Sequence, residues 1–337
     1  MLRPSLAFLL LLLISCSTPV SKLPPCIERR SVIEMGTNRI KLTIADVDVC
    51  KKKFIKTVGR KDWAVEQDSS IYQDFEGTRS LSHEVNDKTI KVFEEAKKII
   101  ATYSEASSPL VIATGVFREV KGSEHVFDKI KNIIGSRPNV ISALKETRLG
   151  EKSLQATEAQ LPTQYLVWDI GGNSMQFTLK QNTKSQYFLG GMGSQFYKQL
   201  AKTILKRKDS PNPIEQKNLP LLKAEFLKVG SSNISKLSGK VENISVYGIG
   251  AVHSESILKR LQDFNESIID LYTINDLRQL TVDTVNLTDG QLGGSYSPNQ
   301  VTNQIIVEAI MDYLKIKQIN VRTLDLTQGA LVYGLKK

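Results

Sequence analysis

The segment YLVWDIGGNSMQ, from Tyr165 to Gln176, decides the fold. Its first six residues are mostly aromatic or branched and apolar, as in a β-strand, and Asp169 stands where that strand ends. Gly171 and Gly172 let the chain turn so sharply that backbone N–H groups can point into one concavity, where no Cβ blocks an anion. Ser174 adds a hydroxyl donor. The pattern predicts a phosphate-binding turn with Asp169 placed to hold Mg²⁺, although an ordinary strand and glycine turn fits the segment equally well when it is taken alone.

A second stretch, SVIEMGTNRIKLTIADV at residues 31–47, repeats this design. It contains a short apolar strand, an acid at Glu34, a glycine at Gly36, the polar residues Thr37 and Asn38, and an alternating strand. Two such hairpins indicate two related halves. This arrangement is similar to the acetate and sugar kinase, actin and heat-shock chaperone superfamily. The resemblance implies an α/β fold with two actin-like (ribonuclease H-like) domains and an interdomain cleft.

Within that superfamily, the chain resembles the exopolyphosphatase and guanosine pentaphosphate phosphohydrolase (Ppx/GppA) family over roughly residues 31 to 335. Four motifs carry the resemblance, in the family's order: EMGTNR at 34–39, ATGVFR at 113–118, ISALKETR at 141–148 and DIGGNS at 169–174. Weaker matches follow at 189–193, at Gly248 and Gly250, and at 328–331.

The resemblance implies hydrolysis of terminal phosphoanhydride bonds. Glu146 would activate the water, and Arg118 would neutralise the neighbouring phosphate with its planar guanidinium. The terminal phosphoryl group would be held by the two turns, and the metal by two acids. The implied phosphate-binding residues are Gly36, Thr37, Asn38, Arg118, Gly171, Gly172 and Ser174, and the implied metal ligands are Asp169 and Glu34. Mg²⁺ is the expected cofactor, with Mn²⁺ as an alternative. Taken alone, Glu146 also fits a solvated residue in the first turn of a helix.

Several positions depart from the family pattern. Gln176 and Lys145 replace acids, Glu34 replaces a shorter Asp, and Ala143 replaces a glycine. Fewer acids should weaken Mg²⁺ binding or abolish activity. A second hypothesis is therefore a catalytically impaired Ppx/GppA-like lipoprotein that binds polyanions or a protein partner. A kinase of the same superfamily is a third hypothesis, against which stand the match at Glu146 and the altered nucleotide-binding loop near Ala251.

The composition describes a globular, basic chain. Its 337 residues suffice for two domains, and 45 Lys and Arg against 35 Asp and Glu give a net charge of +10. This charge favours anionic partners such as polyphosphate. No basic run with interleaved aromatic residues suggests nucleic-acid binding. A homodimer is kept open as a further partner.

The first residues resemble a bacterial lipoprotein signal peptide. Arg3 precedes an apolar core at residues 6–14 that is too short to span a bilayer, and LISC ends at Cys16 as a lipobox. Lipidation at Cys16 would place the chain in the cell envelope, periplasmic or otherwise extracytoplasmic, with the membrane as a partner. Polyphosphate is then a better substrate than a cytoplasmic guanosine nucleotide.

Two further cysteines remain for an oxidising compartment, where a disulfide can persist. Cys26 and Cys50 lie opposite one another in an antiparallel hairpin centred on Asn38. We therefore predict a Cys26–Cys50 disulfide, which would stabilise the fold by about 3 kcal/mol in the chain-entropy model.

The domain boundaries follow from these patterns. We expect a signal peptide at 1–16, a tether at 17–30, a first actin-like domain at 31–145 and a second at 146–319, with 320–337 as a candidate to pack back on the first. Apolar spacing predicts helices at 83–103, 117–134 and 300–314, and a polar loop at about 283–298. His253 is interpreted as a helix-start or surface residue. Trp63 and Trp168 are interpreted as packing residues.

Overall fold

The computed structural model describes residues 23–37, 39–65, 71–73, 79–103, 107–190, 192–265, 267, 270–294 and 296–335. The lipidation candidate Cys16, the signal segment and Asn38 lie outside these residues. None of the helices in the described part of the chain is both long enough and apolar enough to cross a bilayer.

The first half is built on a five-stranded sheet in the order β3-β2-β1-β6-β7. β2 lies antiparallel between β1 and β3, whereas β6 and β7 run parallel to β1. The elements of this half are β1 (Ile27–Met35), β2 (Arg39–Asp48), β3 (Lys53–Ala64), β4 (Ile71–Gln73), β5 (Arg79–Leu81), α1 (His83–Ala101), β6 (Leu110–Ala113), the 3₁₀ turn η1 (Gly115–Arg118), α2 (Glu124–Ile134), β7 (Asn139–Val140) and α3 (Ala143–Thr157). β4 and β5 pair separately from the main sheet.

The second half repeats this plan. Its sheet has the order β10-β9-β8-β11-β13-β12. β9 runs antiparallel to β8, whereas β11 pairs parallel with β8 and β13 pairs parallel with β11. β12 pairs antiparallel with β13 at the edge of the sheet. Its elements are β8 (Gln164–Ile170), β9 (Met175–Gln181), β10 (Lys184–Gly190), α4 (Ser194–Ile204), η2 (Gln216–Asn218), α5 (Leu219–Ile234), η3 (Ser235–Leu237), β11 (Ser245–Ile249), the π-helix η4 (Val252–Leu258), α6 (Lys259–Phe264), β12 (Leu271–Thr273), α7 (Ile274–Thr284), α8 (Asp289–Leu292), α9 (Ser297–Leu314), β13 (Gln318–Val321) and α10 (Leu326–Tyr333).

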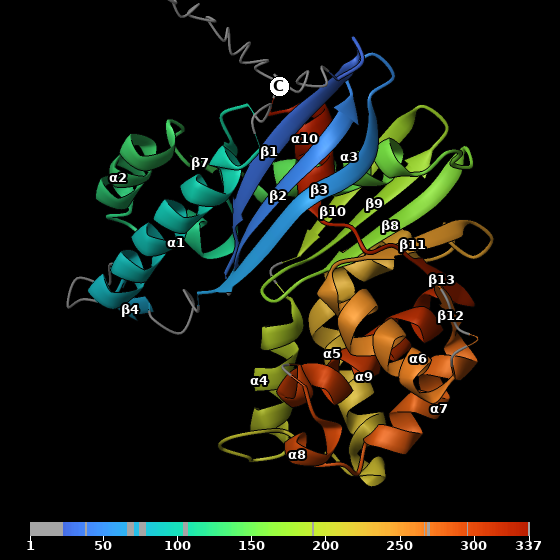
Figure 1. Cartoon of the computed structure of the whole chain (residues 1–337). Helices are drawn as coiled ribbons and strands as arrows, with labels where there is room; N and C mark the ends of the chain where they lie inside the picture. Colours follow the sequence, from blue (N-terminus) through green and yellow to red (C-terminus); the bar gives the residue numbers. More distant parts are fainter. Residues whose placement is uncertain are drawn as a thin grey trace, which may run out of the picture.

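Helices α3 and α10 lie between the two sheets, as Figure 1 shows. Leu149 and Ala156 of α3 pack with α10 on the first sheet, whereas Leu154 packs on the second. The helices cross closely at Gly329, where an added Cβ would lie 2.3 Å from the Leu149 carbonyl oxygen. The last segment is therefore shared, because β13 pairs in the second sheet while α10 contacts β1 and β2 of the first.

The outer face of each sheet carries its own helices. On the first sheet, α1 and α2 bury a core that includes Phe93, Phe127 and Ile130. On the second, a larger core gathers α4 to α9, with α9 the most buried helix. The fully buried Trp168 belongs to this core, as its interpretation as a packing residue requires. His253 lies in the first turn of η4, as expected for a helix-start residue, but it is fully buried beside Trp168, so placing it on the surface was wrong.

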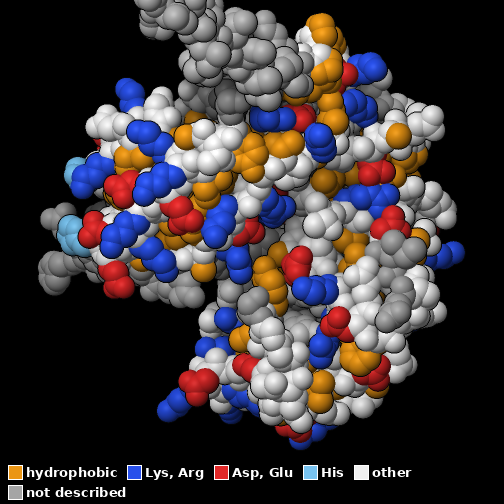
Figure 2. All heavy atoms as spheres, in the orientation of Figure 1, with side chains coloured by type: hydrophobic (Ala, Val, Ile, Leu, Met, Phe, Trp, Pro, Cys, Tyr) orange, Lys and Arg blue, Asp and Glu red, His pale blue; other side chains and the backbone are white. Residues whose placement is uncertain are grey.

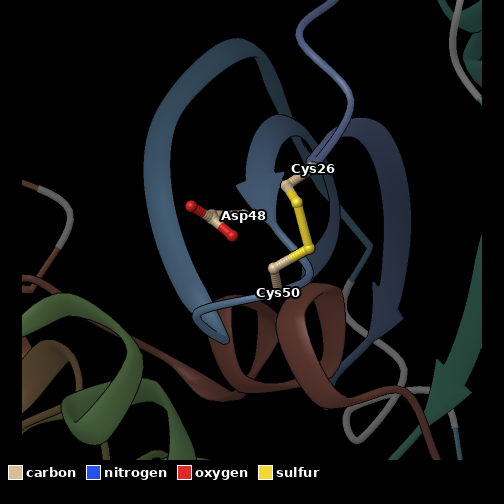
Figure 3. A group of neighbouring side chains, drawn as sticks. All are labelled: Cys26, Asp48 and Cys50. Atoms are coloured by element: carbon tan, nitrogen blue, oxygen red, sulfur yellow. A yellow bond between two sulfur atoms is a disulfide. The ribbon is translucent and has the colours of Figure 1, made fainter.

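Cys26 and Cys50 are joined by a disulfide (Figure 3). The hairpin register is shifted by one residue from that expected, because Ile27 pairs with Asp48 and the Cys26 carbonyl accepts a hydrogen bond from Val49. The turn at the other end of the hairpin holds four residues between Met35 and Ile40 and so is not centred on Asn38. Cys50 lies in the turn after β2.

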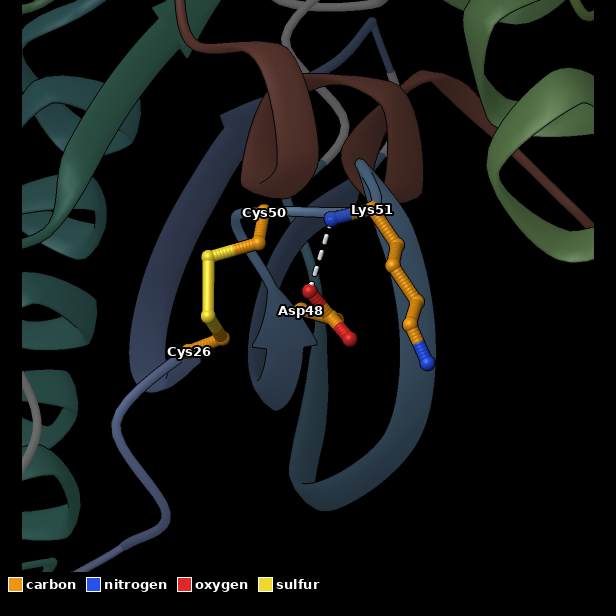
Figure 4. The surroundings of a disulfide bond; sticks show 4 residues. All are labelled: Cys26, Asp48, Cys50 and Lys51. Atoms are coloured by element: carbon orange, nitrogen blue, oxygen red, sulfur yellow. Dashed lines mark hydrogen bonds between the residues drawn. A yellow bond between two sulfur atoms is a disulfide. The ribbon is translucent and has the colours of Figure 1, made fainter.

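Asp48 lies beside this disulfide without forming a metal site with it. The two sulfurs are bonded to each other, so neither is a thiolate ligand. The Asp48 carboxylate instead accepts a 2.8 Å hydrogen bond from the Lys51 backbone N–H, which closes the turn (Figure 4).

Two predicted elements have different bounds in the structure. The helix expected at 117–134 begins only at Glu124, because Gly122 has a φ of 78° and interrupts the chain after η1. The loop expected at 283–298 contains the short helix α8, which is capped by a Thr288 and Gln291 capping box.

Candidate active site

Each of the two glycine turns is closed by an equivalent backbone hydrogen bond. The Gly36 N–H donates to the Arg39 carbonyl at 2.9 Å, and the Gly171 N–H donates to the Ser174 carbonyl at 3.0 Å. This corrects the expectation that the Gly171 N–H binds phosphate, since it is already used within the turn. Gly171 and Gly172 were both predicted to donate to phosphate. The Gly172 N–H donates no hydrogen bond to a described residue and so can still do so.

The second turn is fixed to the start of helix α4. The N–H groups of Ser194 and Gln195 donate to the carbonyls of Gly171 and Gly172 at 2.9 and 2.8 Å. The Ser194 hydroxyl in turn donates to Asn303 of α9 at 2.6 Å within the buried core. The turn therefore belongs to a rigid part of the second half.

The two turns meet at the junction between the halves. The Asn173 side-chain amide donates to the Thr37 hydroxyl at 3.3 Å. Gly115 lies against the same hydroxyl, since an added Cβ would be 2.5 Å from it. In Figure 2 the surface is hollowed between the two halves. Predicted phosphate-binding turns from opposite halves thus face each other.

An acid ends the first strand of each half, and the residue opposite it differs. Glu34 of β1 pairs in register with Lys41 of β2, and Asp169 of β8 pairs in register with Gln176 of β9. The first acid therefore has a cation across the strands, whereas the second has a neutral amide.

Lys41 also connects the first turn to helix α10. Its ammonium lies 3.4 Å from Glu34 Oε2 and 3.4 Å from Asp325 Oδ2. Asp325 is the N-cap of α10 and accepts a 2.9 Å hydrogen bond from the Thr327 N–H. Burial would raise the pKa of Asp325, but Lys41 and the hydrogen bonds from Thr327 outweigh it and lower the pKa.

Sequence reasoning missed both Lys41 and Asp325. The sequence held a signal for each residue. Lys41 lies as many residues after Glu34 as Gln176 lies after Asp169. Asp325 directly precedes the closing helix, where a capping residue is expected.

Asp169 is the acid without a partner cation. Its side chain is half-buried, and no hydrogen bond or ion pair reaches it from the described residues. Burial first, and then the charges of Glu146 and Glu34, raise the pKa of Asp169 to about 8. Burial also raises the pKa of Glu34 to about 7, with Lys41 opposing and Asp325 and Glu146 adding to the rise. These acids therefore lie close enough to destabilise each other's charge.

Glu146 lies in the first turn of α3, next to these acids. Its carboxylate is 2.7 Å from Nη1 of Arg118, and the same nitrogen donates to the Ile141 carbonyl at 3.3 Å. No hydrogen bond or ion pair joins the other nitrogens of Arg118 to the described residues, so they can donate to a ligand. The structure thus brings the predicted base and the predicted phosphate-binding arginine together.

Lys145 does not reach this site. Its ammonium donates to the carbonyl of Leu335, at the far end of α10. Lys145 therefore places its positive charge away from Glu146, and the loss of an acid at this position is what remains of its expected effect.

Gln176 is buried and holds Ser174. Its amide nitrogen donates to the Ser174 hydroxyl oxygen at 2.6 Å, which leaves the hydroxyl proton free to be donated elsewhere. Gln176, which stands where the family has an acid, thus orients the Ser174 hydroxyl that is predicted to bind phosphate.

The two sheets share one topology, two helices lie between them, and their glycine turns meet at the junction. These features define a two-domain protein of the actin-like superfamily. The match to the model of the Ppx/GppA phosphatase family, over residues 65–337, shows that this chain belongs to that family. No functionally curated protein matches the sequence.

Solved structures agree with this fold. The crystal structure of an exopolyphosphatase from Cytophaga hutchinsonii matches with a TM-score of 0.73 at 17% identity, covering 91% of this chain and 98% of that one. The Ppx/GppA family member from Aquifex aeolicus matches with a TM-score of 0.72 at 17% identity, covering 91% and 97%.

Gly250→Ala should disturb the site. Gly250 has a φ of 86°, and an added Cβ would lie 2.7 Å from Asp169 Oδ1 and 2.9 Å from the Ile170 carbonyl oxygen. Gly239→Ala is a matched control, because Gly239 has a φ of 71° but nothing within 4 Å of an added Cβ. We expect Gly250→Ala to lose about 2 kcal/mol more unfolding free energy than Gly239→Ala in urea titrations. Equal losses would mean that only the backbone conformation matters at Gly250.

Asp169→Asn should change how stability depends on pH. Because the folded-state pKa of Asp169 is raised to about 8, the folded protein holds a proton that the unfolded chain releases near pH 4. Asp169 therefore costs stability increasingly as pH rises from about 4 to about 8. We expect Asp169→Asn to be more stable than wild type at pH 8 by about 1 kcal/mol, with a smaller difference at pH 5.

The control for that measurement is Asp209→Asn, which removes an exposed acid of the same half. Urea denaturation at both pH values gives the comparison. A wild-type-like pH dependence in Asp169→Asn would contradict the assignment.

Proposed function

We propose that this protein hydrolyses the terminal phosphoanhydride bonds of inorganic polyphosphate or a related polyphosphorylated compound. The observation that carries the proposal is the contact between the two glycine turns, with Glu34 beside the first and Asp169 against helix α3, which carries Glu146. Membership of a phosphatase family and the likeness in fold to an exopolyphosphatase support it. The net charge of +10 suits a polyanionic substrate.

Asp169 is the residue we assign to a divalent cation, Mg²⁺ or Mn²⁺. It is the cleft carboxylate to which the described residues offer no cation, while Glu34 already contacts Lys41. Among the described residues, no three acids of this site bring ligand oxygens within 4.8 Å of one another. Such a site suits Mg²⁺, which usually keeps several waters and binds one or two carboxylates together with substrate phosphates. When bound, the cation would neutralise charge on the phosphate oxygens.

The remaining steps belong to the side chains and turns. The Gly172 N–H and the Ser174 hydroxyl on one side, and Thr37 on the other, would hold the terminal phosphoryl group between the halves. The free nitrogens of Arg118 would contact the next phosphate. Such positioning and charge neutralisation provide most of the catalysis in phosphoryl transfer.

Glu146 is the proposed general base. It would accept a proton from a water whose oxygen attacks the terminal phosphorus, while the bond to the bridging oxygen breaks. The products are inorganic phosphate and a chain shortened by one unit. The 2.7 Å ion pair with Arg118 holds the Glu146 carboxylate in place before the substrate enters.

Glu146→Gln should reduce phosphate release from long-chain polyphosphate by about 10²- to 10⁴-fold, because the amide cannot accept the proton. The measurement is phosphate release with Mg²⁺ or Mn²⁺, and Glu94→Gln, an exposed change on α1, is the control. Undiminished release by Glu146→Gln would refute the base assignment.

The same assay decides the second candidate function, a catalytically impaired polyanion-binding protein. Gln176 favours it, because the neutral amide opposite Asp169 leaves one acid fewer for a metal. Polyphosphate binding without phosphate release by wild type would establish this alternative.

We also propose that the protein is a lipoprotein of the bacterial cell envelope, attached to the membrane through Cys16. The lipobox supports this, and the Cys26–Cys50 disulfide suits an oxidising compartment. Mass spectrometry of protein from its own envelope should find an N-terminal peptide that begins at lipid-modified Cys16. An unprocessed N-terminus at Met1 would contradict the proposal.

A further inference from the structure

Lys41 lies where a cation would otherwise be needed to hold Glu34 and Asp325 together. We propose that the Lys41 ammonium takes the place of a second metal ion, so that the site binds one divalent cation, at Asp169. This inference rests on the proposed function for the presence of the Asp169 cation, but the position of Lys41 itself is independent of it.

The first argument is the difference between two otherwise equivalent halves. Both acids end the first strand and stand directly opposite a residue of the second strand: Lys41 for Glu34, and Gln176 for Asp169. The Gln176 amide is neutral and donates to Ser174, and no hydrogen bond joins it to Asp169 among the described residues. One half thus supplies its own cation, and the other leaves its acid for a cation from solution.

The second argument is the contact geometry. The ammonium is equally distant, at 3.4 Å, from a carboxylate oxygen of Glu34 and from one of Asp325. The side chain of Lys41 is 25% exposed, and those of Glu34 and Asp325 are 10% and 18% exposed. A shielded ammonium between two shielded carboxylates leaves no position for a metal ion between the same oxygens, because like charges at that distance repel strongly.

The third argument is the charge of the site. Four carboxylates, those of Glu34, Glu146, Asp169 and Asp325, meet two cations, Lys41 and Arg118. With all four carboxylates ionised, as a bound divalent cation would favour, two negative charges remain, and one divalent cation neutralises them. Arg60 approaches Asp325 only to 3.9 Å from the rim and shares its charge with Asp62 at 3.5 Å.

Three variants test the inference by counting bound Mn²⁺ in calorimetry and in electron paramagnetic resonance of the free ion. Lys41→Met keeps the length of the side chain without its charge, Lys41→Arg keeps the charge, and Asp169→Asn removes the assigned ligand. Thermal melts first establish that each variant is folded. We expect one Mn²⁺ for wild type and Lys41→Arg, two for Lys41→Met, and none for Asp169→Asn.

A double variant separates the two proposals. Lys41→Met with Asp169→Asn should bind one Mn²⁺, now between Glu34 and Asp325. If wild type binds no Mn²⁺ but this double variant binds one, the proposed metal site at Asp169 is refuted, whereas the proposed role of Lys41 is supported. Two Mn²⁺ in wild type with affinities within tenfold of each other, or no additional Mn²⁺ in either Lys41→Met variant, would overturn the inference.

Discussion

The structure depends on a concentration of negative charge that the fold itself does not neutralise. Four carboxylates from β1, β8, α3 and the start of α10 share the junction between the halves, and burial together with the charges of neighbouring acids raises the pKa of Glu34 and of Asp169. Lys41 and Arg118 offset part of this charge. Asp169 is left without a cation, which destabilises the free protein and favours a ligand that brings positive charge.

Rigid packing keeps these charges in place. Helix α3 carries Glu146 and is fastened to both sheets: Lys53 of β3 donates to the Glu158 carbonyl at 2.6 Å, and the buried Glu151 accepts from Tyr187 of β10 at 2.8 Å. Helix α10 carries Asp325 and meets α3 at Gly329, where the Ser153 hydroxyl accepts the Gly329 N–H at 2.7 Å. The acids therefore cannot move apart without breaking interdomain contacts.

The same physical device is used twice with different side chains. In both halves, a glycine N–H closes a turn onto the carbonyl three residues later, and an acid precedes the turn. A further glycine after a parallel strand packs on each turn, Gly115 against Thr37 and Gly250 against Asp169. The halves differ in charge, through Lys41 and Gln176, and this difference gives the site one open acid.

The sequence by itself determined the two halves and the family, because glycine turns after apolar strands are local patterns that a short segment specifies. It also indicated which cysteines pair, although the hairpin register was wrong by one residue, since turn length is set by the Gly36 to Arg39 hydrogen bond. Only the tertiary structure decided which charges meet. Lys145 reaches Leu335 and Lys41 reaches Asp325, contacts between residues far apart in the chain that no local pattern encodes.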